Sequence, residues 1–229
     1  MADRILKFAL APVLVAQALR VRKTAASLPE PPGARAGRTG KGPPLRLAIL
    51  GDSSAAGVGA RHQSEALSGR LTELLASHYA LDWSLHARTG ATTKSVLRKW
   101  PGGLQTLDIA IIILGVNDVT RQVPLRRLLA QREQLYARLQ RDHGAMRVLA
   151  TGVPPLADFP LLPAPLRHVL GHQARRYDAA LSQQAKELGV EYLPFNLSLD
   201  PDMMAADGFH PGPTAYRHFA DILFRQIQR

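Results

Sequence analysis

The sequence LRLAILGDSS at residues 45–54 is the clearest guide to the architecture of this protein. It begins as a short, mostly apolar run, and glycine, aspartate and serine then interrupt it. A short apolar run bounded by turn residues indicates a buried strand, so we predict a strand over residues 45–50. The polar residues that follow then stand where the chain leaves that strand.

The same alternation continues to the C-terminus. Further apolar runs predict strands at residues 81–87, 107–114, 146–151 and 190–194. Helical spacing of leucines and other apolar residues predicts helices at 64–79, 92–99, 123–141, 167–188 and 213–228. The unbroken apolar run at 109–113 is typical of a central parallel strand that is covered on both faces. Strands alternating with helices predict an α/β domain with a five-stranded parallel sheet and right-handed crossovers.

The first 44 residues differ in composition from the rest, and we predict three parts. Residues 1–23 hold an apolar run with a basic flank, residues 24–44 are a linker rich in Pro, Gly and Arg, and residues 45–229 are the domain. The apolar run at 5–19 is shorter than the ~20 residues that a membrane span needs. An export signal cleaved near Ala16-Gln17-Ala18, a membrane-surface anchor at residues 5–23 and a helix packed on the domain stay open. Membrane-associated, exported and cytoplasmic locations stay open with them.

Composition narrows the function classes. The chain has 229 residues, 46% of them hydrophobic and 21% charged, which suits one globular domain. It has no cysteine, which excludes disulfides, a thiolate nucleophile and cysteine-based metal sites. The formal net charge is +11, but the arginines lack the interleaved series of aromatic residues that a base-stacking platform would require. We therefore expect solvated basic helix faces and no nucleic-acid partner.

Polar segments follow three of the predicted strands, at residues 51–54, 88–90 and 115–118. The carboxyl ends of parallel strands meet at one edge of a sheet, and ligands bind there in such folds. A further pair, Asp207 and His210, lies before the last predicted helix. We therefore expect these segments to converge on one site.

The residue types in these segments suit acyl transfer. That reaction needs a hydroxyl, a base to take its proton, a group to orient the base, and donors for the oxyanion. Ser53 supplies the hydroxyl, His210 the base and Asp207 the orienting carboxylate. The side-chain amide of Asn117 and the backbone N–H groups of Ser53 and Gly90 are the candidate oxyanion donors. A glycine at position 90 lets substrate approach the backbone closely.

These segments resemble the four blocks of the SGNH (GDSL-type) hydrolase family, and they occur in the family's order. The matching residues are Gly51-Asp52-Ser53, Gly90, Gly115-x-Asn117-Asp118 and Asp207-x-x-His210. The resemblance implies a flavodoxin-like three-layer α/β/α fold and ester hydrolysis without metal or cofactor. It also implies an oxyanion hole made of Ser53, Gly90 and Asn117. Ser54 departs from the family, which often has leucine there, but the spacing of the block favours Ser53 as nucleophile.

Other residues have supporting or structural interpretations. Asp52 is expected to cap the turn at the nucleophile, and Asp118 to order the loop that bears Asn117. The Pro-rich apolar loop at 154–166 either walls an acyl pocket or only covers the core. The pocket interpretation assigns substrate contact to Phe159, Leu161 and Leu162.

The sequence therefore predicts a serine hydrolase for short- to medium-chain or lipid-like esters, acting through an acyl-enzyme on Ser53. Its expected partner is a small-molecule ester, and membrane contact is expected only through residues 5–23. One alternative is a flavodoxin-like module that binds a nucleotide or flavin at the same sheet edge and has no hydrolase activity. A second is a membrane-tethered interaction protein with a vestigial site.

Overall fold

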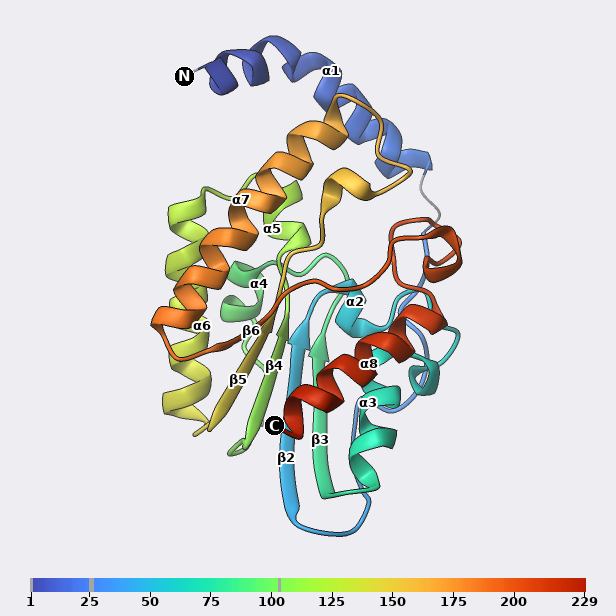
Figure 1. The fold of residues 1–229 in the computed structure, drawn as a ribbon, viewed down its shortest axis with the longest axis vertical. Helices are drawn as coiled ribbons and strands as arrows, with labels where there is room; N and C mark the ends of the chain where they lie inside the picture. Colours follow the sequence, from blue (N-terminus) through green and yellow to red (C-terminus); the bar gives the residue numbers. More distant parts are fainter. Residues whose placement is uncertain (1, 25–26, 103) are drawn as a thin grey trace.

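The strands of this chain form a single sheet in the order β1-β3-β2-β4-β5-β6 (Figure 1). The computed structural model describes residues 2–24, 27–102 and 104–229. Strands β2 to β6 are parallel to one another, and β1 is antiparallel to β3. Their bounds are β1 Ala36–Thr39, β2 Pro44–Gly51, β3 Ala80–Ala87, β4 Ile109–Ile113, β5 Arg147–Thr151 and β6 Glu191–Leu193.

Helices cover both faces of the sheet and make a three-layer structure (Figure 1). Helices α3 (Leu67–Ala76) and α8 (Pro213–Ile227) pack on one face, and α4 (Thr93–Arg98), α6 (Leu125–Asp142) and α7 (Leu166–Glu187) on the other. The other helical segments are α1 Ala2–Thr24, α2 Ser53–Ala56, α5 Val116–Thr120, η1 Gln63–Glu65, η2 Leu156–Asp158 and η3 Pro201–Met203.

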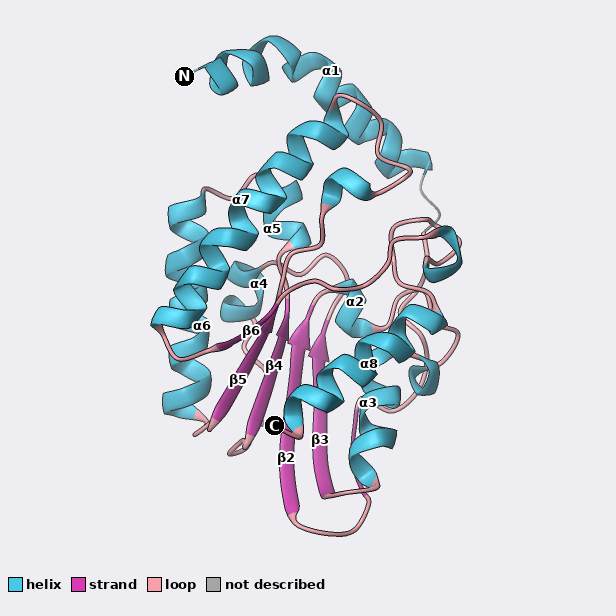
Figure 2. Cartoon of the chain, viewed as in Figure 1, coloured by secondary structure: helices cyan, strands magenta, loops and turns pink. Residues whose placement is uncertain are grey.

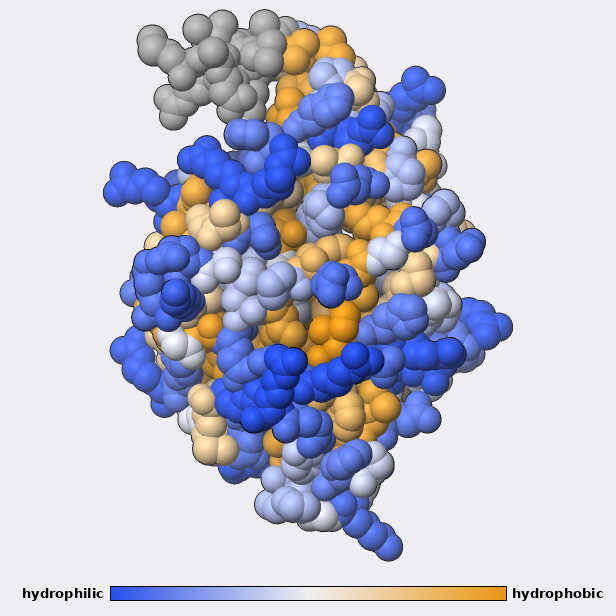
Figure 3. Space-filling view, in the orientation of Figure 1, coloured by the Kyte–Doolittle hydropathy of each residue, from blue (hydrophilic) through white to orange (hydrophobic). Residues whose placement is uncertain are grey.

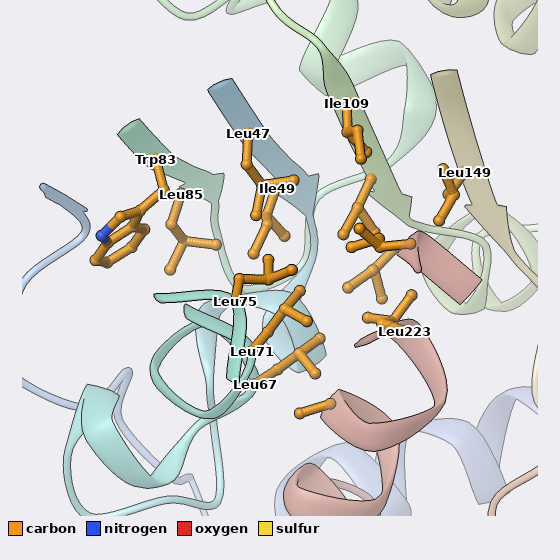
Figure 4. Packing of buried hydrophobic residues seen from close by; sticks show 14 of the residues in the cluster. Leu47, Ile49, Leu67, Leu71, Leu75, Trp83, Leu85, Ile109, Leu149 and Leu223 are labelled. Carbon is orange, nitrogen blue, oxygen red and sulfur yellow. The ribbon is translucent and has the colours of Figure 1, made fainter. Parts of the chain in front are cut away.

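Alternation along the buried strands sends side chains into two cores. Leu47 and Ile49 of β2 belong to the cluster that also contains Leu71 and Leu75 of α3 and Leu223 of α8 (Figure 4). Their neighbours Ala48 and Leu50 pack instead with α4 and α6. Successive residues of a strand point to opposite faces, so an unbroken apolar run fills both cores.

The order of the strands determines where a site can form. The chain passes from β2 to β3 on one side and then returns to place β4 on the other side of β2. Gly51 at the end of β2 pairs with Ile113 at the end of β4. In open α/β sheets a ligand crevice forms outside the carboxyl ends at such a reversal. Figure 2 shows the loops gathered at this end of the strands.

The five predicted parallel strands are confirmed, and the sheet has a sixth strand that the sequence did not predict. This is the antiparallel edge strand β1, which lies inside the segment predicted as a linker. All its residues are exposed, so it lacks the apolar pattern that would have indicated a strand. The same segment is tied to the domain where Glu30 accepts hydrogen bonds from the backbone N–H and hydroxyl of Thr89, at 2.6 and 2.8 Å.

Residues 2–24 form helix α1, which lies beside the N-terminal end of α7 (Figure 1). The side-chain amide of Gln17 bonds to the carbonyl oxygen of Ala164, in the loop before α7, and to the backbone N–H of Leu166, the first residue of α7. Of the helices in the described residues, none is apolar over a sufficient length to cross a bilayer. The predictions of a cleaved signal and of a surface anchor are not tested by this arrangement, and Met1 lies outside the described residues.

Candidate active site

Ser53 is the first residue of the short helix α2, directly after β2. The preceding residue, Asp52, caps this helix, and its carboxylate accepts a hydrogen bond from the backbone N–H of Ser54 at 3.1 Å. Gly51 permits the sharp exit from the strand, because a Cβ there would lie 2.3 Å from Ala55 and 2.7 Å from the carbonyl of Ile113. The strand and the helix together hold the Ser53 hydroxyl at the sheet edge.

The structure brings Ser53, His210 and Asp207 into one hydrogen-bonded line. His210 Nε2 lies 2.8 Å from Ser53 Oγ, although 157 positions separate the two residues in the sequence. On the other side of the ring, His210 Nδ1 lies 2.5 Å from Asp207 Oδ2. A base that contacts a hydroxyl on one side and a carboxylate on the other can take a proton and be oriented while doing so. Ser54 lies beside the same cavity but has no such contact with His210.

Asp207 is buried, and its surroundings favour its ionised form. Burial by itself opposes ionisation. Hydrogen bonds from the His210 ring, the backbone N–H of His210 and the backbone N–H of Phe209 outweigh that effect and hold the pKa of Asp207 below its usual value. Only 3% of the Asp207 side chain is exposed, against 23% for His210. The carboxylate thus stays charged and fixed, while the imidazole reaches the cavity.

Asn117 lies in α5, which follows β4, and its amide faces the base of the nucleophile turn. Asn117 Nδ2 donates to Asp52 Oδ2 over 3.4 Å, and a second N–H of the amide is available for another acceptor. Its neighbour Asp118 is fully buried and accepts bonds from the backbone N–H of Thr93, at 3.2 Å, and from the Thr93 hydroxyl, at 2.8 Å. Asp118 therefore joins the α5 turn to the start of α4.

Asp52 is the most perturbed carboxylate of the site. The pKa of Asp52 is raised to about 7, chiefly by burial. The hydrogen bond from Ser54 N–H lowers this pKa, and the charge of Asp118 contributes to raising it. A buried cation, Arg132 of α6, acts in the opposite direction. Arg132 also donates to the carbonyl oxygen of Leu114, at 2.6 Å, directly before the turn that bears Asn117. The sequence did not single out Arg132, because in the sequence it is one arginine among several in a basic helix.

Gly90 lies in the turn after β3 with a left-handed backbone conformation, φ +74°. A side chain would be strained at this φ, which explains a glycine here. Its carbonyl oxygen accepts a bond from Arg121 Nη2 at 2.9 Å, which ties this turn to the end of α5. No acceptor among the described residues contacts the backbone N–H of Gly90. Gly90 is not, however, one of the residues that line the cavity at Ser53.

A mainly apolar cavity of about 330 Å³ opens at Ser53 and His210. Phe159 and Leu162 line it, in agreement with the pocket interpretation of the 154–166 loop. The assignment of Leu161 to this pocket is wrong. Leu161 is 53% exposed, is absent from the cavity lining, and packs over Gly208. In this turn of the loop Phe159 and Leu162 are buried, whereas Pro160 and Leu161 between them are exposed.

Much of the cavity wall comes from residues that sequence reasoning missed. Phe195, Leu197 and Leu199 lie between β6 and η3 and line the cavity together with Phe209. Their spacing of two residues in an irregular segment was a usable signal, since alternate residues of an extended chain share a face. Another missed contact is Val21 of α1, which lies far from every catalytic motif in the sequence.

Comparisons with known proteins agree with this geometry. A sequence model of the GDSL-like lipase/acylhydrolase family matches residues 49–218. A GDSL-like esterase of Mycobacterium tuberculosis is 30% identical over 200 residues, which cover 80% of this chain. The matched region spans 62% of the length of that esterase.

Solved structures share the fold. TesA superposes with a TM-score of 0.66 at 23% identity, and the match covers 80% of this chain and 98% of TesA. The psychrotrophic esterase EstA from Pseudoalteromonas sp. gives 0.63 at 20% identity, covering 80% of this chain and 97% of EstA. The acetylxylan esterase Axe2 from Geobacillus stearothermophilus gives 0.59 at 17% identity, with 82% and 96% covered.

Proposed function

This chain belongs to the GDSL-like lipase/acylhydrolase family, and on that premise we propose that it is a serine hydrolase of carboxylic esters. The observation that carries the proposal is the line of hydrogen bonds from Ser53 through His210 to Asp207. It supplies nucleophile, base and orienting carboxylate at the mouth of an apolar cavity. The substrate is a small-molecule ester whose acyl part enters that cavity.

In the first half of the reaction, Ser53 Oγ attacks the ester carbonyl carbon while His210 Nε2 accepts the hydroxyl proton. The resulting oxyanion is held by the backbone N–H groups of Ser53 and Gly90 and by the Asn117 amide. The N–H of Ser53 suits this role because the first N–H groups of a helix have no intrahelical acceptor. His210 then gives its proton to the departing alkoxide, and the acyl group stays on Ser53.

In the second half, water takes the place of the alcohol. His210 accepts a proton from the water as its oxygen attacks the acyl carbonyl, and the same donors hold the second oxyanion. Collapse of this intermediate returns the proton to Ser53 Oγ and releases the carboxylic acid. Asp207 keeps the ring oriented and stabilises its positive charge in both halves.

Asp52 and Asp118 support this machinery without touching the reacting atoms. Asp52 fixes the start of α2 through Ser54 and accepts a bond from Asn117. Asp118 holds α5 against α4 through Thr93. These bonds restrict the motion of the turns that carry the oxyanion donors, and pre-organised donors are what stabilise a developing charge.

The cavity favours short- to medium-chain acyl groups or lipid-like esters as substrates. Its lining is mainly apolar and includes Phe159 and Leu162, which suits a hydrocarbon chain rather than a polar acyl group. The alternative of a nucleotide- or flavin-binding module gains no support. It would make no use of Asp207 and His210, which are bonded to each other and to Ser53.

We also propose the division of the chain into residues 1–23, a connecting segment 24–44 whose strand β1 joins the edge of the sheet, and a hydrolase domain 45–229. Residues 5–23 contact an anionic membrane surface. Two observations support this contact. Helix α1 exposes Val13, Val15 and Leu19, and residues 2–24 hold five basic residues and one acidic residue. Apolar side chains flanked by cations favour the surface of an anionic bilayer.

Turnover of p-nitrophenyl acetate and butyrate by the wild-type protein and by Ser53→Ala tests the proposed reaction. We expect release of p-nitrophenol by the wild type and a loss of at least ~10³-fold in kcat for the variant. Equal rates for the two proteins would refute the assignment of Ser53 as nucleophile. Absence of wild-type turnover with every ester tested would refute ester hydrolysis.

A further inference from the structure

Helix α1 contributes to the cavity at Ser53, although it lies outside the region that the family model matches. The match begins at residue 49, whereas Val21 of α1 lines the same cavity as Ser53, His210 and Phe159. Figure 1 shows α1 lying over the end of α7 and the loop before it, on the carboxyl side of the strands. The wall that Val21 adds therefore belongs to the N-terminal segment of this chain.

Gln17 fixes α1 to the C-terminal end of the 154–166 loop, which also lines the cavity. Its Nε2 donates to the carbonyl oxygen of Ala164 at 2.6 Å, and its Oε1 accepts from the backbone N–H of Leu166 at 3.1 Å. One amide thus satisfies two backbone groups of a single turn. The same loop carries Phe159 and Leu162 into the cavity, so the bond fixes α1 relative to the cavity lining.

The residues of α1 that face the domain lie on one side of the helix. Leu14 and Val21 pack against the buried cluster that contains Leu162 and Leu170, and Gln17 lies between them in the sequence. Positions 14, 17 and 21 follow the i, i+3, i+7 spacing of a single helix face. On other sides of α1, Val13, Val15 and Leu19 are 46%, 58% and 61% exposed. In Figure 3 the described part of α1 beside the grey atoms accordingly shows orange, apolar surface.

We propose that α1 is a wall of the acyl-binding cavity and that Val21 limits the length of acyl chain that the cavity accepts. The two hydrogen bonds of Gln17 hold Val21 in place. This inference rests on the proposed ester hydrolysis. A side chain larger than valine at position 21 would fill part of the cavity, and a smaller side chain would lengthen the cavity. Residues near Ser53 contact the acyl group of every ester substrate. Val21 contacts only acyl chains that are long enough to reach it.

Burial of each additional methylene raises kcat/KM ~4-fold for as long as the chain finds apolar surface. The wild-type profile therefore rises with chain length and levels off where the chain meets the wall. Val21→Trp moves that plateau to shorter chains and lowers kcat/KM for the longest well-accepted ester by ~10-fold or more, since at least two such methylenes lose their place. Gln17→Ala removes the bonds that fix α1, so kcat/KM levels off less sharply as the acyl chain lengthens.

The experiment measures kcat/KM for monomeric p-nitrophenyl esters from acetate to decanoate. The matched control is Val15→Trp, the same substitution at an exposed position of the same helix. We expect Val21→Trp to shorten the preferred chain, so that the ratio of kcat/KM for decanoate to kcat/KM for acetate falls ~10-fold or more below the wild-type ratio. Val15→Trp should leave the whole profile unchanged.

Failure of this inference is distinguishable from failure of the proposed function. If Ser53→Ala abolishes acetate turnover but Val21→Trp and Val15→Trp give the same chain-length profile, hydrolysis stands and the α1 wall is refuted. If Val21→Trp does not fold, Val21→Ala decides the question: a plateau shifted to longer chains supports the wall, and an unchanged profile refutes it.

Discussion

At the scale of the residue, Asn117 is the side chain whose substitution tests the proposed oxyanion hole. Its amide is oriented by a 3.4 Å hydrogen bond to Asp52. The turn that carries Asn117 is itself held by hydrogen bonds of Arg132 and Asp118. An amide fixed before substrate arrives needs no rearrangement when charge develops on the carbonyl oxygen. The effect of removing it should therefore fall on the chemical step and not on binding.

Asn117→Ala should lower kcat for p-nitrophenyl butyrate ~10²–10³-fold with a much smaller change in KM, as for the loss of one oxyanion donor in other serine hydrolases. Steady-state kinetics check this directly. Asn196→Ala, at an asparagine outside the cavity lining, is the control and should match the wild type. A loss confined to KM would contradict the oxyanion role.

Asp52 gives a prediction about stability and pH. Its pKa is raised to about 7 by burial, whereas an unfolded aspartate titrates near ~3.9. Between those values the folded state holds a proton that the unfolded state releases, so this group makes the free energy of unfolding fall as pH rises, by up to ~1.4 kcal/mol per pH unit. Asp52→Asn removes that contribution.

Urea denaturation at pH 5 and pH 8 measures the effect. Relative to wild type, Asp52→Asn should gain stability on going from pH 5 to pH 8. A difference between the two proteins that is the same at both pH values would show that Asp52 does not titrate in this range in the folded protein.

At the scale of the element, helix α8 fixes the segment that carries the base. The loop with Asp207 and His210 leads directly into α8 at Pro213, and α8 packs on the sheet beside α3. Tyr216 of α8 is fully buried, and its hydroxyl donates to the carbonyl oxygen of Val58 at 2.7 Å, just after the nucleophile helix. One hydrogen bond therefore links the base-bearing and nucleophile-bearing parts of the chain.

Tyr216→Phe should lower the free energy of unfolding by ~1–3 kcal/mol, because it leaves the buried Val58 carbonyl without a partner. Tyr79→Phe is the matched control, since its hydroxyl makes only a long, exposed bond of 3.5 Å to Gln228. Chemical denaturation of both variants decides the comparison. An equal loss of unfolding free energy in both variants would mean that the buried bond from Tyr216 stabilises the fold no more than the exposed one.

Sequence patterns predicted most elements, because burial on both faces imposes unbroken apolar runs such as residues 109–113. They failed for β1, whose residues are all exposed, and for α5, which has only five residues. The candidate triad was predictable because its residues belong to short motifs. Val21 and Arg132 were not, because their contacts depend on packing between distant segments.

At the scale of the whole molecule, charge is the strongest feature. The formal net charge is +11, and basic residues are frequent in the segment that exposes Val13, Val15 and Leu19. Figure 3 shows strongly hydrophilic surface around apolar patches on one face. A cationic protein is attracted to an anionic bilayer, and salt screens that attraction over ~10 Å at 0.1 M.

Sedimentation with vesicles tests the proposed membrane contact. Binding to vesicles with anionic lipid should exceed binding to neutral vesicles by ~10-fold and should weaken strongly in 0.5 M salt. Arg20→Glu combined with Lys23→Glu should reduce it, and Arg175→Glu combined with Arg176→Glu, on α7, serves as the charge-matched control. Equal binding to neutral and anionic vesicles would contradict an electrostatic surface contact.

The account depends most on the meeting of Ser53 and His210, which lie 157 positions apart in the sequence. Labelling with a fluorophosphonate, mapped by mass spectrometry of proteolytic peptides, tests it most directly. We predict one adduct per chain, on Ser53, formed at the wild-type rate in Ser54→Ala and at least ~10³-fold more slowly in His210→Ala. An adduct on Ser54, or labelling of Ser53 that is as fast without His210, would contradict the account.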